Sequence, residues 1–168
     1  GLRDYVQDNG FVKVILGLSG GIDSALVAVI AKQALGSNNV TAYMLPSKFT
    51  SRESIEDAEE LAKNLGIVLK SIDIKEIFES FLATLSKDTP INKNSITFQN
   101  LQSRIRGTIL MAKANENNSL LITTGNKSEY ATGYATIYGD MNGAFNPIKD
   151  LYKTQLYSLV QYLNSTMS

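Results

Sequence analysis

A short apolar run that leads into a glycine-rich turn, and then into a helical pattern, constrains the fold of this chain more than any other feature. Residues 11–18 read FVKVILGL, a mostly apolar stretch of strand length. The turn Ser19-Gly20-Gly21-Ile22-Asp23-Ser24 follows at once, and apolar residues then recur at helical spacing through residue 34. Gly36 is a natural helix stop. This order predicts a strand covered on both faces, a tight turn and a helix.

The same alternation continues along the first half of the chain. Residues 40–45 and 67–72 predict two more strands, and Thr50 to Glu53 matches a capping box that opens a helix ending at Gly66. Strands that alternate with helices imply parallel pairing. We therefore predict an α/β fold, a doubly wound parallel sheet in three α/β/α layers, within one domain of 168 residues.

The second half of the chain is less regular. Residues 74–85 and 100–115 predict helices with a polar loop between them, and residues 120–124 predict a fourth strand. Residues 127–150 are rich in Gly, Tyr, Asn and Thr. In a compact domain, such a stretch indicates a loop that forms a site.

The glycine-rich turn has the chemistry of an anion site. The first amides of a helix lack partners and the helix dipole is positive there. Gly20 and Gly21 let the backbone approach phosphate oxygens, and Ser19 and Ser24 add hydroxyl donors. Asp23 would repel phosphate unless a cation lay between them, which indicates Mg²⁺. The turn is neither a Walker loop nor GxGxxG. The alternative is a tight turn in which Asp23 is only a helix N-cap.

The composition excludes several kinds of chemistry. The chain has no cysteine and no histidine, which removes thiolate nucleophiles, zinc sites of the usual kind and the commonest general base. The 16 basic residues balance the 16 acidic residues, so the whole chain has no basic footprint for nucleic acid. No apolar run is long enough to span a membrane. We expect a cytoplasmic protein whose chemistry depends on carboxylates, lysine, arginine, hydroxyls and hard cations.

Further candidate residues follow the predicted strands, where ligands of open parallel sheets collect. Glu129, after the fourth strand, is a candidate second carboxylate for the cation, and the alternative is a solvated surface residue. Arg104 and Arg106 lie on the predicted helix 100–115 and are candidates to hold an anionic substrate, against the alternative of surface salt bridges.

Four ordered motifs together resemble a known family. The turn at 19–24 (SGGIDS) resembles the loop of the N-type ATP pyrophosphatases. Residues 100–107 (NLQSRIRG), 123–129 (TTGNKSE) and 133–141 (GYATIYGDM) resemble NAD synthetases. The sequences of these motifs are most similar to those of the synthetase domain of the glutamine-dependent form. The resemblance implies a Rossmann-like fold of the adenine nucleotide alpha hydrolase type. It covers nearly the whole chain, to about Tyr157.

The resemblance also implies a reaction. In that family the carboxylate of deamido-NAD attacks the α-phosphate of ATP, pyrophosphate leaves with Mg²⁺, and ammonia displaces AMP to give NAD. The substrates would be ATP, deamido-NAD and ammonia, with Mg²⁺ as the cation. A displacement at phosphorus needs positioning and charge neutralisation more than a histidine base, so a chain without histidine can perform it.

The resemblance assigns roles to individual residues. ATP phosphates would bind at Gly17, Leu18, Ser19, Gly20, Gly21, Ile22, Asp23 and Ser24. Thr124 and Lys153 would contact ATP, and Asn100 and Arg104 would contact deamido-NAD. Asp23 would bind Mg²⁺, and Glu129 would serve either Mg²⁺ or deamido-NAD. Asp23, Lys153 and Asp140 would act at the reacting centre. Ile137 stands where ammonia-dependent relatives carry a lysine, so that one substrate contact does not carry over.

The resemblance also implies a domain organisation and partners. We expect residues 1–168 to be a single synthetase domain, truncated at its C-terminal end and without the upstream amidase domain that would release ammonia from glutamine. The isolated chain is then expected to bind nucleotide weakly and to catalyse poorly or not at all. Fold analogy predicts a homodimer through helix 100–115, whose Leu101, Ile105, Ile109, Leu110 and Ala112 have ordinary core as the alternative.

Two other functions compete with this assignment. One is a different N-type ATP pyrophosphatase ligase, such as a GMP-forming enzyme, and a tRNA-modifying member is disfavoured by the lack of a basic face and of cysteines. The other is a nucleotide-binding module without catalysis.

Overall fold

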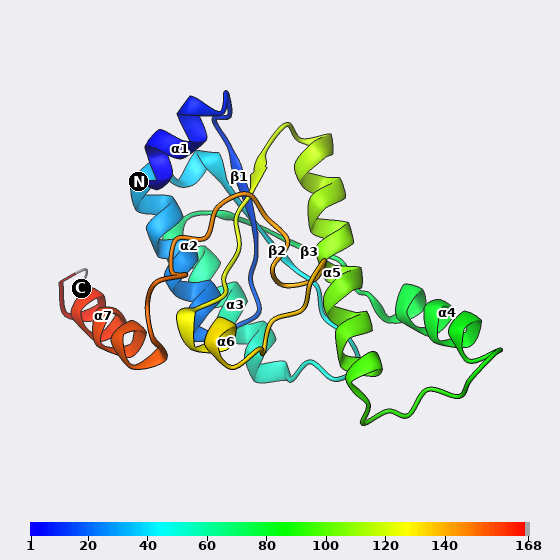
Figure 1. Ribbon diagram of the computed structural model, residues 1–168. Helices are drawn as coiled ribbons and strands as arrows, with labels where there is room; N and C mark the ends of the chain where they lie inside the picture. Colours follow the sequence, from blue (N-terminus) through cyan, green and yellow to red (C-terminus); the bar gives the residue numbers. More distant parts are fainter. Residues whose placement is uncertain (167–168) are drawn as a thin grey trace.

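Four parallel strands form the central sheet (Figure 1). The structure is a computed structural model that describes residues 1–166. The strands are β1 (Val14–Gly17), β2 (Val40–Met44), β3 (Val68–Ser71) and β4 (Leu120–Leu121), in the order β3-β2-β1-β4. The chain therefore runs from β1 outward to β2 and β3, and then returns to place β4 on the other side of β1. This is the predicted doubly wound parallel sheet.

Helices cover both faces of the sheet. They are α1 (Leu2–Asp8), α2 (Ile22–Leu35), α3 (Arg52–Leu65), α4 (Lys75–Leu85), α5 (Ile96–Glu116), α6 (Lys127–Ala131) and α7 (Lys153–Thr166), with a 3₁₀ turn η1 (Ser37–Asn39) after α2. The core clusters place α1, α2, α3 and α7 on one face and α5 on the other, with α4 packed against α5 (Figure 1). The predicted three-layer α/β/α arrangement is confirmed.

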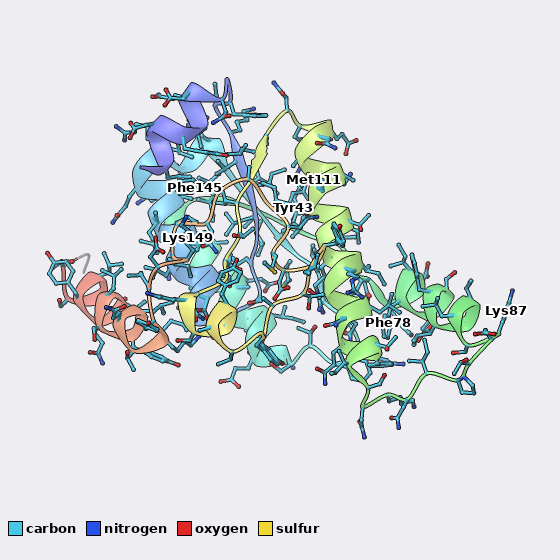
Figure 2. All side chains as sticks on the ribbon, in the orientation of Figure 1. Tyr43, Phe78, Lys87, Met111, Phe145 and Lys149 are labelled. Carbon is cyan, nitrogen blue, oxygen red and sulfur yellow. The ribbon has the colours of Figure 1, made fainter. Side chains whose placement is uncertain are left out.

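Alternating side chains of the strands contribute to separate apolar clusters on the two faces of the sheet. Val14 and Leu16 of β1 lie in the cluster beneath α2, whereas Ile15 faces α5. All three are almost fully buried, as expected of a strand covered on both faces. Tyr43 of β2 also lies on the α5 side, where Met111 packs against its cluster (Figure 2).

A glycine at the end of β1 lets α5 approach the sheet. A Cβ atom at Gly17 would lie 3.2 Å from Leu110 Cδ1 of α5, closer than most real contacts. The helix therefore packs against the backbone at the end of β1, beside the glycine-rich turn.

The ends of several elements differ from the sequence prediction for local reasons. β1 begins at Val14 because the Phe11 amide donates to Val6 O (3.0 Å) and so belongs to the end of α1. β4 is assigned to Leu120–Leu121: the Ile122 amide still donates to Ile15 O of β1 (2.9 Å), but the Thr123 amide donates to Phe145 O (2.9 Å) instead. α5 begins four residues earlier than predicted.

Serine caps explain the starts of α5 and α3. Ser95 Oγ accepts a hydrogen bond from the Phe98 amide (3.2 Å) and starts α5 at Ile96. The predicted capping box at Thr50 is wrong, because Ser51 is the N-cap of α3 and its Oγ accepts from the Ser54 amide (3.1 Å). Thr50 Oγ1 accepts instead from the Ser47 amide (2.9 Å).

The apolar residues of α5 are mainly ordinary core. Leu101 and Ile105 are buried in a cluster with Phe78 of α4, and Ile109 and Leu110 pack against it. Ala112 is exposed. Dimerisation through this helix stays a prediction. Within residues 1–166, no helix has the length and apolar character needed to cross a membrane.

Candidate active site at the carboxyl ends of the strands

A cavity of about 370 Å³ opens where β1, β2 and β4 end. The strand order makes the gap between β1 and β4 the point where connections switch direction, and open parallel sheets bind ligands at that point. Apolar walls come from Leu18, Met44, Leu45 and Leu110, and polar groups from Ser19, Ser103, Arg106, Thr123, Thr124 and Asp140. A cavity with apolar walls and a few convergent polar groups is typical of a small-molecule site.

The glycine-rich turn begins at Ser19 on the cavity wall and is shaped by contact with α3. Gly20 has φ +81°, and a Cβ atom there would lie only 2.3 Å from Ser54 O. Both the backbone angle and the contact require glycine. Ser24 Oγ donates to Gly21 O (2.9 Å) and lies 3.1 Å from Ser19 Oγ, so the two hydroxyls brace the turn from within.

Asp23 is not the helix N-cap. The N-cap of α2 is Gly21, which makes no side-chain cap. Asp23 lies in the first helical turn, and its carboxylate has two partners from distant parts of the chain: Asn126 Nδ2 donates to Oδ1 (2.8 Å) and Lys153 Nζ donates to Oδ2. The interpretation of Asp23 as only a cap is therefore wrong.

Three segments meet around this carboxylate. Glu129 stands on α6, where its Oε2 accepts from the Asn126 amide (3.0 Å) and its own amide donates to Asn126 Oδ1 (3.1 Å). The Asp23 side chain is 18% exposed and that of Lys153 is 37% exposed, so the ion pair is partly shielded from water. The structure thus brings Asp23, Glu129 and Lys153, far apart in sequence, into one cluster beside the first turn of α2.

The donor set of this cluster fits Mg²⁺ held together with phosphate. No group of three or more His, Cys, Asp or Glu residues suited to a metal occurs in the described chain. Mg²⁺ in nucleotide sites is commonly bound by one or two carboxylates, with phosphate oxygens and water supplying the other ligands. Asp23 and Glu129 provide two carboxylates that share Asn126 as a neighbour. The side chains present match the metal only if a phosphate ligand completes it.

Two cavity residues have features that the sequence did not predict. Thr123 Oγ1 is buried at the cavity wall and has no hydrogen-bond partner among residues 1–166. A buried polar atom of this kind calls for a ligand or water group in the cavity. Arg106 Nε donates to Leu45 O (3.0 Å) at the end of β2, and burial lowers the pKa of its guanidinium. In the sequence, the only signal for Thr123 as a site residue is its position directly before Thr124, at the end of a strand.

The remaining predicted residues gather on the α5 side of the cavity. Asn100 Oδ1 accepts from Thr136 Oγ1 (2.9 Å), and Arg104 Nε donates to Ile137 O (3.2 Å). Asp140 Oδ1 accepts from the Thr136 amide (2.6 Å), which closes the turn 136–140. The structure therefore joins Asn100, Arg104 and Asp140 through this turn, apart from the cluster around Asp23.

Close packing holds this turn against α5. A Cβ atom at Gly107 would lie 2.7 Å from Gly139 O, and one at Gly139 would lie 2.3 Å from Ser103 Oγ. Tyr138 has φ +63°, a strained angle for a residue with a side chain, and the residue is 77% exposed. The turn thus forms one wall of the cavity while presenting an aromatic ring to solvent.

Comparison with known proteins identifies relatives of the whole chain. The family model described as NAD synthase matches residues 1–167. The glutamine-dependent NAD(+) synthetase of Thermotoga maritima is 58% identical over 165 residues, which are 98% of this chain and 29% of that protein. The corresponding protein of Rhodobacter capsulatus is 51% identical, over 99% of this chain and 30% of that protein. The chain thus spans under a third of the length of these curated relatives.

Solved structures agree with the fold. Glutamine-dependent NAD+ synthetase from Acinetobacter baumannii, in complex with ADP, matches with a TM-score of 0.95 at 48% identity, over 99% of this chain and 31% of that one. An NH3-dependent NAD synthetase from Campylobacter jejuni matches with a TM-score of 0.89 at 41% identity, over 97% and 69%. The Rossmann-like fold of the adenine nucleotide alpha hydrolase type is confirmed.

Proposed function

This chain belongs to the NAD synthase family, and we propose that it performs the ATP-dependent amidation of deamido-NAD to NAD. The deamido-NAD carboxylate attacks the α-phosphorus of ATP, and pyrophosphate leaves. Ammonia then attacks the carbonyl carbon of the adenylate, AMP leaves with the electron pair of the broken C–O bond, and the added nitrogen loses one proton to solvent. The product is the amide, with carbon–nitrogen bond formation driven by cleavage of ATP.

The observation that carries this proposal is the cluster of Asp23, Glu129 and Lys153 beside the first turn of α2. A helix N-terminus alone binds many anions or none. A carboxylate in that first turn, with a second carboxylate and a lysine next to it, suits an anion that arrives with a divalent cation. A magnesium complex of ATP is such a ligand.

The roles of the chain's own groups follow from their positions. The amides at the start of α2 and the turn at Gly20 and Gly21 would bind phosphate oxygens. Asp23 and Glu129 would hold Mg²⁺, which neutralises phosphate charge when bound. Lys153 would leave Asp23 and neutralise charge on the departing pyrophosphate. Thr124, at the cavity wall, would contact the nucleotide.

We propose that deamido-NAD binds on the side of the cavity formed by α5 and the turn 136–140. Asn100 and Arg104 hold the turn 136–140, and Asp140 lines the cavity on the same side. This wall and Ser19 line the same cavity, so a carboxylate held at the wall would share that cavity with a nucleotide held at the turn before α2. The chemistry then depends on alignment of two bound substrates rather than on a protein nucleophile.

The nitrogen source and the assembly are further proposals. The names of the curated relatives support glutamine as the source, with ammonia released by a separate amidase domain of a longer protein. We also propose a homodimer and a cytoplasmic location. Free ammonia would serve the synthetase step when no amidase is present.

Binding of magnesium and nucleotide tests the proposal at its first step. We expect ATP to bind this chain at least tenfold more tightly with Mg²⁺ than with EDTA, measured by calorimetry. Asp23→Asn should remove most of that difference, since a lost metal ligand or its support commonly costs 10–100-fold. Asp150→Asn, a change at an exposed aspartate, is the control. Equal ATP binding with and without Mg²⁺ would refute the assigned site.

Exchange of pyrophosphate into ATP separates the enzyme from a mere binding module. An enzyme that forms the adenylate incorporates labelled pyrophosphate into ATP only when deamido-NAD is present. A binding module binds ATP and shows no exchange. A GMP-forming relative would require a different acceptor, so exchange that ignores deamido-NAD contradicts the substrate that we propose.

A further inference from the structure

Asn126 is the most deeply buried polar side chain next to the carboxylate cluster. It is 1% exposed, and it lies between the end of β4 and α6. None of the roles above belongs to it. Its side chain contacts the two segments that carry the carboxylates. Nδ2 donates to Asp23 Oδ1 (2.8 Å), and Oδ1 accepts from the Glu129 amide (3.1 Å).

The hydrogen bonds fix the orientation of this amide. The Glu129 N–H can only donate, so it must face the Asn126 oxygen. An ionised Asp23 can only accept, so it must face the Asn126 nitrogen. The amide therefore has one self-consistent orientation, in which one end caps α6 and the other holds Asp23.

Capping alone does not explain asparagine at this position. Ser, Asp and Asn are about equally good N-caps. An ionised aspartate has no donor, and serine has a single oxygen that would have to make both contacts, whereas asparagine accepts from the Glu129 amide through one atom and donates to Asp23 through another. An asparagine at this position is therefore explained by the bond to Asp23 rather than by the cap of α6.

The segment that carries Asn126 is itself anchored. The Lys127 amide donates to Leu151 O (2.9 Å), and the Lys153 amide donates to Ser128 Oγ (3.1 Å). Lys127 Nζ also lies 4.5 Å from the centre of the Tyr152 ring. α6 and the start of α7 therefore form one unit, and Asn126 is its side-chain link to Asp23.

From this geometry, we propose that Asn126 is a positioning residue that holds the Asp23 carboxylate in register with Glu129, so that the two can share one divalent cation. The inference rests on the proposed function, because it assumes that Asp23 and Glu129 bind the cation. Asn126 itself touches neither metal nor substrate in this role. Its removal should loosen the pair of carboxylates without removing either one.

The variant Asn126→Ser tests this role. Serine keeps an oxygen that can cap α6, but its side chain is too short to donate to Asp23. We expect ADP affinity in EDTA to change less than about twofold, and affinity in saturating Mg²⁺ to fall about tenfold, as for other groups that orient metal ligands. A purely structural role would weaken both affinities alike or neither.

Asn146→Ser is the matched control. Asn146 Nδ2 donates to Gly125 O (2.8 Å) and to Tyr130 Oη (2.9 Å), and Oδ1 accepts from the Ile148 amide (3.1 Å). Its side chain makes hydrogen bonds within the same region, and none of them is to Asp23. The selective loss of Mg²⁺-dependent affinity in Asn126→Ser alone supports the inference, and an unchanged Mg²⁺ effect in that variant overturns it. If Mg²⁺ does not raise the ADP affinity of the unaltered chain, that result would instead refute the proposed function on which the inference rests.

Discussion

Gly20 offers a sharp test of how the nucleotide turn is built. The replacement Gly20→Ala adds a Cβ atom at φ +81°, where an ordinary residue costs about 1–2 kcal/mol. That atom would also lie 2.3 Å from Ser54 O and 2.8 Å from Ser54 Cα, which are backbone atoms of α3 that cannot rotate away. Overpacking of this kind costs about 1–3 kcal/mol more. The expected total is roughly 2–5 kcal/mol of unfolding free energy.

A second glycine separates the two contributions. Gly10 has φ +76°, and no atom lies within 4 Å of the place a Cβ would take. Gly10→Ala therefore suffers the backbone strain without the contact. Both alanines reduce the entropy of the unfolded chain alike, so that effect cancels in the comparison. The difference between the two variants measures the contact with α3, which we expect to be about 2 kcal/mol.

Urea denaturation and thermal unfolding provide the measurement. For a chain of this size, 1 kcal/mol shifts the melting temperature by about 2–4 °C, so Gly20→Ala should melt about 6 °C below Gly10→Ala. Because the turn moves away from α3, Gly20→Ala should also lose nucleotide affinity, whereas Gly10→Ala should keep it. Equal stability of the two variants would refute the close approach of the turn to Ser54.

Two further predictions concern α5 and α3. Gly107→Ala places a Cβ atom 2.7 Å from Gly139 O, so it should cost about 1–3 kcal/mol and make the turn 136–140 more susceptible to limited proteolysis; equal proteolysis rates would contradict the packing. Ser51→Ala removes the N-cap of α3 and should lower the unfolding free energy by about 1 kcal/mol in urea denaturation, and an unchanged midpoint would argue against Ser51 as the cap.

The fold was largely predictable because its signals are local. The apolar run before Ser19, the helix stops at Gly36 and Gly66, and the alternation of strands and helices all act within a few residues of one another. Gly66 indeed ends α3 with φ +65°. Errors arose where a distant segment decided the outcome. β4 is short because the Thr123 amide donates to Phe145 O rather than to β1, and no local pattern contains that information.

The site was predictable in part and for a different reason. The turn at 19–24 indicates phosphate by its own chemistry, but Lys153 was assigned only by resemblance. Its contact with Asp23 crosses 130 residues, and that of Asn126 crosses 103. Asn126 is the N-cap of α6 in the structure, and its bond to Asp23 joins it to a residue that no local sequence pattern links to it. Pairing across such distances depends on the whole sheet order.

The balance of charge in the cluster gives a reason for its composition. Asp23 and Glu129 are two carboxylates and Lys153 is one cation, so the three groups leave an excess of negative charge beside the α2 N-terminus. A polyphosphate approaching alone would meet that excess, which opposes the attraction of the helix amides. A divalent cation bound between the carboxylates would make the net charge of the cluster positive, because its two positive charges exceed the one net negative charge of the three side chains. The same residues that repel free nucleotide would then attract its magnesium complex, and the partial shielding of the Asp23–Lys153 pair from water makes both effects stronger than on an open surface.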